Sequence, residues 1–203
     1  MVKKIFTVLI IGTVTIGVIY GGIKMTAKKV AIIDVKGTID IDNEFMEKID
    51  KVRKDKKIGA VLLRVDSGGG TAFGGNQYYE TIKKLQEEKP VYTYVTGLAA
   101  SAAYMTILPS NHIMSSQIAM VGSVGVFSAS INIQGFLKKL GVKVDLEKSS
   151  PLKASPNLFE EGTEEAKQLR KASVKTMMDY FRDVVEKNRT IPKEFKEEVF
   201  KAI

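Results

Sequence analysis

Residues 58–75, with the sequence IGAVLLRVDSGGGTAFGG, join a nearly continuous apolar run to a glycine-rich stretch. The run 58–65 is typical of a β-strand that is buried on both faces, as strands of parallel sheets are. The residues after the glycine-rich stretch carry a helical pattern that ends near Glu88, before Pro90. We therefore expect a strand over 58–65, a loop over 66–75 and then a helix, which is the repeating unit of an α/β fold.

The rest of the chain continues this alternation on both sides of residues 58–75. Short apolar runs predict strands at 30–35, 91–95, 112–115 and 118–121, and an extended segment at 142–146. Helices are expected at 42–54, after the small-residue turn 97–103, at 135–140 and at 163–187, with a polar loop at 147–162. Together these elements predict one α/β domain with a largely parallel sheet over residues 30–203.

Residues 5–23 form a run of nineteen residues without a charge. A helix of this length covers roughly 28 Å, which is close to the hydrocarbon thickness of a bilayer. A cleavable signal peptide is the main alternative, but its apolar core is normally about 7–15 residues long and ends at a small-x-small site, which this run lacks. We therefore expect residues 1–29 to be an uncleaved membrane anchor with one transmembrane helix, whose orientation the flanking lysines leave open.

The composition excludes several kinds of site. The 203 residues include no cysteine and a single histidine, His112, so thiolate chemistry and multi-histidine sites are excluded, and we expect no metal and no cofactor. Without a basic patch interleaved with aromatic residues, nucleic acid is not an expected partner. Much of the net charge of +8 comes from lysines that flank the apolar run, namely Lys3, Lys4, Lys24, Lys28 and Lys29.

Two segments could carry chemistry. The glycine-rich loop could bind a phosphate, stabilise an oxyanion or be a plain turn, and it matches neither common nucleotide-binding motif. Ser101 lies among small residues between a strand and a helix, so it is either a nucleophile or the N-cap of that helix. His112 has no clear acidic partner, so a catalytic triad is poorly supported. A lysine whose amine is buried and neutral can replace histidine as the base.

Four motifs occur in an order and at spacings that together resemble one protein family. They are VDSGGG at 65–70, GLAASAAY at 97–104, VGSVGV at 121–126 and KSSPLK at 148–153. The sequence resembles the signal peptide peptidase A family of bacterial membrane serine proteases, which share the ClpP/crotonase fold. The likeness covers nearly the whole chain, including the apolar N-terminal run.

The resemblance implies a role for each matched residue. It makes Ser101 the nucleophile and Lys153 the general base, and Ser123 the residue that orients the lysine amine. It also implies that the N–H groups of Gly69 and Ala102 form the oxyanion hole.

The chain departs from the family pattern at two places. Asp66 and Gly68 stand where the family usually has asparagine and proline, which makes the loop less rigid and puts a carboxylate near the oxyanion site. The chain also ends at about the point where the last βα segment of the family would begin, so we expect either a fragment or a family member with a shortened C-terminal segment.

The resemblance further implies a function and a setting. We expect a serine endopeptidase at the cell membrane that degrades cleaved signal peptides or other small hydrophobic peptides, with its catalytic domain outside the cytoplasm. It would form a homo-oligomeric ring in which neighbouring subunits supply the serine and the lysine. Peptidases encoded beside stomatin-like proteins and phage capsid-maturation peptidases are close alternatives. A crotonase-like acyl-CoA enzyme and an inactive scaffold are alternatives from other classes.

Overall fold

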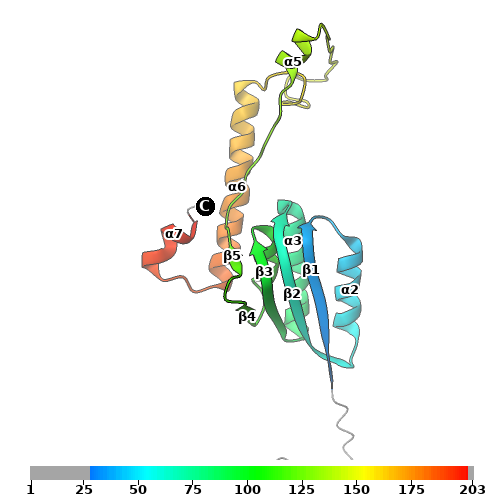
Figure 1. Ribbon diagram of the computed structural model, residues 1–203, viewed down its shortest axis with the longest axis vertical. Helices are drawn as coiled ribbons and strands as arrows, with labels where there is room; N and C mark the ends of the chain where they lie inside the picture. Colours follow the sequence, from blue (N-terminus) through cyan, green and yellow to red (C-terminus); the bar gives the residue numbers. More distant parts are fainter. Residues whose placement is uncertain (1–27, 201–203) are drawn as a thin grey trace, which may run out of the picture.

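The computed structural model describes residues 28–200, and at its centre is a sheet of five strands (Figure 1). The strand order is β1-β2-β3-β4, every pair is parallel, and β5 pairs with the end of β3. This arrangement confirms the expected α/β class with a parallel sheet. The strands are β1 (Lys29–Ile39), β2 (Ile58–Gly70), β3 (Val91–Ala100), β4 (His112–Ser115) and β5 (Met120–Gly122).

Helices follow the strands and continue beyond the sheet. They are α2 (Asn43–Lys54), α3 (Ala72–Glu88), α4 (Ala102–Ile107), α5 (Gln134–Lys139), α6 (Glu164–Asn188) and α7 (Lys196–Phe200), with a 3₁₀ turn at Lys193–Phe195. Three of them begin at a side-chain cap, in which Asp42, Thr71 and Thr163 each accept a hydrogen bond from a backbone N–H of the first turn. Because such caps satisfy amides that have no partner within the helix, the local sequence decides where these helices start.

The hydrophobic core lies between one face of the sheet and the helices α2, α3 and α4. Arg64 of β2 points to the other face, where it makes a two-bond ion pair with Asp34 of β1. Side chains on that second face, such as Ile32, are exposed in the part of the chain that the structure describes. The expectation that 58–65 is buried on both faces is therefore wrong. The residues of β2 that reach the core are Val61, Leu63 and Val65.

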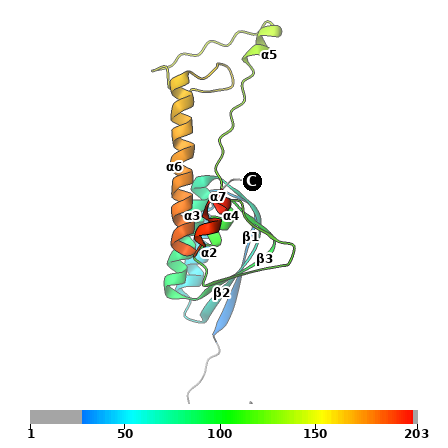
Figure 2. The ribbon, with the colours of Figure 1, turned by 90° about the vertical axis from the view of Figure 1, so that its left-hand side faces the viewer.

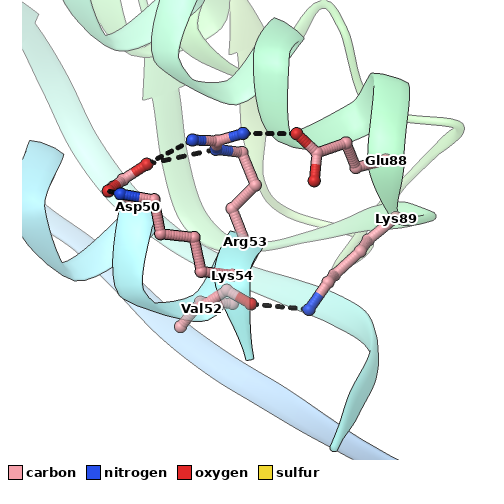
Figure 3. A network of polar contacts seen from close by, with 6 residues as sticks. All are labelled: Asp50, Val52, Arg53, Lys54, Glu88 and Lys89. Carbon is pink, nitrogen blue, oxygen red and sulfur yellow. Dashed lines mark hydrogen bonds and ion pairs between the residues drawn. The ribbon is translucent and has the colours of Figure 1, made fainter. Parts of the chain in front are cut away.

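Polar contacts join the C-terminal ends of α2 and α3, at the edge of the sheet where the strands begin (Figure 3). Arg53 of α2 contacts Asp50 of its own helix and Glu88 of α3. Lys89, which follows α3, donates a hydrogen bond to the carbonyl of Val52 at 2.7 Å. These contacts fix the two helices to each other at the edge opposite the carboxyl ends of the strands.

Residues 129–163, called the arm below, extend away from the sheet beyond the N-terminal end of α6 (Figures 1 and 2). No residue of α5 is buried, and residues 142–146, which we expected to be extended, belong to no strand. The C-terminal half of α6 returns to the core, where Phe181 and Val185 are part of one buried cluster with Met105 of α4.

The predicted membrane anchor over residues 5–23 lies outside the described residues. Within residues 28–200, no helix is both long and apolar enough to cross a bilayer. The expected start of the globular domain at residue 30 falls one residue inside β1, because the N–H of Lys29 already donates to the carbonyl of Lys57 at 2.8 Å.

Candidate active site

Ser101 lies at the junction of β3 and α4 and has an unusual backbone conformation. Its φ of 54° and ψ of −122° lie outside the regions that residues with a side chain normally adopt. The N–H of Ser101 donates to the carbonyl of Gly122 in β5 at 2.9 Å, and its own carbonyl accepts from Met105 at 3.0 Å. Backbone strain of this kind costs about 1–3 kcal/mol and persists only where the surrounding structure enforces it.

The side chain of Ser101 does not cap α4. Although the residue occupies the cap position, its hydroxyl accepts no hydrogen bond from the first turn of the helix. The N-cap alternative therefore does not explain this serine. Ala102, the first residue of α4, has no acceptor for its N–H within the helix, so a backbone donor lies next to the serine hydroxyl.

Gly69 lies directly against this junction. A Cβ atom on Gly69 would come within 2.9 Å of the Ser101 Cβ and 3.0 Å of the Ala102 nitrogen, so a side chain does not fit there. The φ of Gly69, +100°, also favours glycine. The structure therefore places Gly69, Ser101 and Ala102 directly against one another.

The N–H of Gly69 already has a partner in this structure. It donates to the hydroxyl of Ser67 at 3.1 Å, and that hydroxyl donates to the carbonyl of Gly37 at 2.6 Å. A substrate oxygen would have to replace Ser67 as the acceptor. In the sequence, the one signal that Ser67 offers is its place before three consecutive glycines.

The glycine-rich residues form the end of a strand. β2 continues to Gly70, where β1 is so close that a Cβ would lie 1.8 Å from the carbonyl oxygen of Ile39. β3 likewise continues to Ala100, beyond the expected end at residue 95. The expected loop over 66–75 is therefore wrong, because the glycines permit close strand pairing and α3 begins already at Ala72.

Ser101 lines two cavities. The first, of about 780 Å³, lies between α3, α4 and α6. The second, of about 840 Å³, follows the glycine-rich end of β2 and includes Asp66 and Ser123. Residues 125–127 line both. Cavities of this size are typical of ligand sites.

Asp66, the residue that departs from the family pattern, is held against β3. One of its carboxylate oxygens accepts the N–H of Leu98 at 3.1 Å. The same oxygen lies so close to Gly97 that a Cβ there would be 2.8 Å away. This bond ties one carboxylate oxygen to the backbone, and the residue as a whole lines the second cavity.

Lys153 lies in the arm and lines neither cavity. It is exposed, on a turn in which its N–H donates to the carbonyl of Ser150 at 3.1 Å. Ser123 directly follows β5, has a φ of 53°, and shares the second cavity with Ser101. A single copy of the chain therefore holds Ser101, Ser123 and the two predicted donors in one region and Lys153 in another.

Within residues 28–200, no three histidine or acidic side chains cluster in a way that could hold a metal ion. His112 begins β4, is exposed, and lines neither cavity.

The sequence matches the profiles of two protease families. The Clp protease profile matches residues 22–120, and the profile of peptidase family S49 matches residues 83–201. A Methanocaldococcus jannaschii protein assigned as a protease is 34% identical over 143 residues, which cover 70% of this chain and 46% of that protein. The chloroplastic serine protease SPPA of Arabidopsis thaliana is 30% identical over 175 residues, 80% of this chain and 24% of the relative. Protease 4 of Haemophilus influenzae is 28% identical over 176 residues, 81% of this chain and 28% of the relative.

The chain belongs to peptidase family S49. It spans about half or less of the length of these curated relatives.

Proposed function

We propose that the chain carries the catalytic domain of a membrane-anchored serine endopeptidase, with Ser101 as the nucleophile. The observation that carries this proposal is the strained backbone of Ser101 together with a hydroxyl that caps nothing. Strain is retained at a strand end when it serves to present a side chain to a substrate. Membership of peptidase family S49 supports the same chemistry.

In this mechanism the Oγ of Ser101 attacks a peptide carbonyl, and backbone N–H groups stabilise the negative charge that develops on the carbonyl oxygen. The N–H of Ala102 is one donor. The N–H of Gly69 becomes the second donor when it exchanges the hydroxyl of Ser67 for the oxyanion. Loss of one donor of this kind typically costs about 10²–10³ in rate.

Lys153 takes the proton of Ser101, and it comes from a neighbouring copy of the chain. Two features support a shared site, since Lys153 is exposed in the arm and lines neither cavity of its own copy. A head-to-tail ring, in which each copy offers its arm to the next, brings the two residues together. Burial favours the neutral form of an amine, which is the form that a base requires, and Ser123 orients it.

The substrates are cleaved signal peptides or other small hydrophobic peptides. The first cavity suits them because apolar side chains such as Phe73, Met105 and Met177 line it. Residues 5–23 anchor the enzyme in the cell membrane, with the catalytic domain outside the cytoplasm. The anchor thereby keeps the enzyme where peptides leave the bilayer.

Labelling with a fluorophosphonate probe tests the proposed nucleophile. The full chain should form one adduct, and mass spectrometry of its peptides should locate that adduct on Ser101. Ser101→Ala should abolish labelling. Ser115→Ala, which changes an exposed serine at the end of β4, should leave it unchanged. An adduct on another residue, or labelling that persists in Ser101→Ala, would rule out Ser101 as the nucleophile.

A further inference from the structure

Among residues 28–200, Arg170 is the only charged residue that lines the first cavity. It belongs to α6 and is half-buried, and the cavity also contains Ser101. The other described residues of the lining are apolar or uncharged, so this guanidinium is the charged group that they leave to attract an anionic part of a ligand.

The guanidinium of Arg170 has no acidic partner among residues 28–200. Glu164, one of two acidic residues in the first turn of α6, instead forms an ion pair with Lys167 at 2.7 Å. A half-buried guanidinium presents a planar set of donors that matches a carboxylate with two parallel hydrogen bonds. The free carboxylate at the end of a peptide is the ligand that fits both this charge and the apolar cavity around it.

The second cavity carries the opposite charge. In the part of the chain that the structure describes, Asp66 is the only charged residue that lines it. Ser101 and residues 125–127 are common to both cavities. A short peptide with two free ends therefore has a preferred direction across Ser101. Its carboxylate end is favoured in the cavity of Arg170, and its amino end is favoured in the cavity of Asp66.

The distance along α6 sets how much peptide fits between the two groups. Tyr180 of α6 donates a hydrogen bond to Asn76 of α3, and α3 touches the start of α4, because a Cβ on Gly75 would lie 2.8 Å from that of Ala102. Through these two contacts, Tyr180 is the part of α6 that lies beside the start of α4, where Ser101 is. Arg170 lies ten residues before it, or about 15 Å along the helix, which is the length of about four residues of extended chain.

We propose that Arg170 binds the C-terminal carboxylate of the substrate, so that the enzyme selects short peptides that end about four residues beyond the scissile bond. This inference rests on the proposed function, in which Ser101 is the nucleophile. An internal segment of an intact protein has no carboxylate at that position and leaves the guanidinium unpaired. Released peptides are thereby preferred over membrane proteins that have not been cut.

Binding measurements test the inference independently of catalysis. The full chain with Ser101→Ala is titrated with one apolar eight-residue peptide, made once as the free acid and once as the C-terminal amide. The acid should bind about 10- to 100-fold more tightly at neutral pH, as a hydrogen-bonded charge pair allows. Adding Arg170→Gln should bring this ratio close to one. Lys171→Gln, which removes an exposed charge at the next position of α6, should preserve it.

Three results would overturn the inference. They are equal affinities for acid and amide, an equal loss of preference in Arg170→Gln and Lys171→Gln, and a change of assembly size in Arg170→Gln by light scattering. The last result would assign Arg170 to a contact between copies. Cleavage of the same peptides by the unmodified chain is measured separately. If neither peptide is cleaved, the proposed function fails, whereas the affinity ratio still decides the role of Arg170.

Discussion

The region around Ser101 is held in place by contacts within one copy of the chain, whereas the arm that contains Lys153 has few such contacts. Ser101 is held between strand ends and buried helices, with its backbone bonded to β5. The arm has an exposed helix, and apolar side chains such as Ile131, Phe136 and Leu140 remain open to solvent. We infer that the nucleophile is preformed in each copy, and that the base depends on contacts between copies.

The largest effect is expected from Lys153→Ala, which removes the proposed base. Loss of a general base typically lowers the rate by about 10²–10⁴. Because Lys153 is exposed, the temperature of unfolding should not change. Lys143→Ala, which changes another exposed lysine of the arm, is the matched control for both measurements. Near-normal hydrolysis of a peptide ester by Lys153→Ala would contradict the role of Lys153.

Mixing two inactive variants tests whether Ser101 and Lys153 act from different copies of the chain. Subunits with Ser101→Ala and subunits with Lys153→Ala are combined, dissociated and allowed to reassemble. If each site takes its serine and its lysine from different copies, activity should rise from near zero to about a quarter of the normal value. No recovery in verified mixed assemblies would show that each site lies within one copy.

The free energy of unfolding of two Ser101 variants measures the backbone strain at this residue independently of its role in catalysis. Ser101→Gly should be more stable than Ser101→Ala by about 1–2 kcal/mol, because glycine tolerates the positive φ but loses more entropy on folding. Urea unfolding of both variants provides the comparison. At Ser115, a strand residue with an ordinary φ, the glycine variant should instead be the less stable one. If Ser101→Gly is less stable than Ser101→Ala, as expected at Ser115, the conformation carries no strain.

The smallest effect concerns the loop of the arm that contains Lys153. Lys148 and Glu160 form an ion pair across this loop, and the bond from Lys148 lowers the pKa of the Glu160 carboxyl. The ion pair therefore stabilises the loop at pH values above the ordinary carboxyl range. This stabilisation is lost as the pH falls through the lowered pKa of Glu160. Glu160→Gln should reduce kcat/KM by about two- to fivefold at neutral pH.

The exposed pair Lys143–Asp145 is the control for that experiment. It lies in the same arm, at 2.8 Å, but both side chains are largely open to solvent. Asp145→Asn should therefore leave kcat/KM unchanged. If both variants lose activity equally, the Lys148–Glu160 pair has no specific part in holding the loop.

Local signals were enough to predict most of the fold. The helix α2 was expected from its apolar spacing, and Asp42 caps it as its side chain allows. The end of β2 was missed because three glycines suggest a turn, whereas close pairing with Ile39 extends the strand through Gly70. Burial of β2 on one face was also missed, since the exposure of Arg64 depends on what covers the sheet.

The site was less predictable than the fold. The meeting of Gly69, Ser101 and Ala102 followed from the family resemblance, but the conformation of Ser101 depends on a bond to Gly122, which no local pattern reveals. Arg170 belongs to a helix whose pattern suggests an ordinary amphipathic surface. Its place in the lining of the first cavity follows only from the packing of α6 beside α3 and α4.

The hydrogen bond between the Ser101 N–H and the Gly122 carbonyl makes β5 a mechanical link. This strand has three residues, is paired with the last three residues of β3, and continues through residues 125–127 toward the arm. A shift of that segment would act directly on the backbone of Ser101 through this hydrogen bond. Docking of an arm onto a neighbour should therefore also set the alignment of the serine in the copy that donates the arm, and slower hydrogen exchange of the Ser101 amide on assembly would report it.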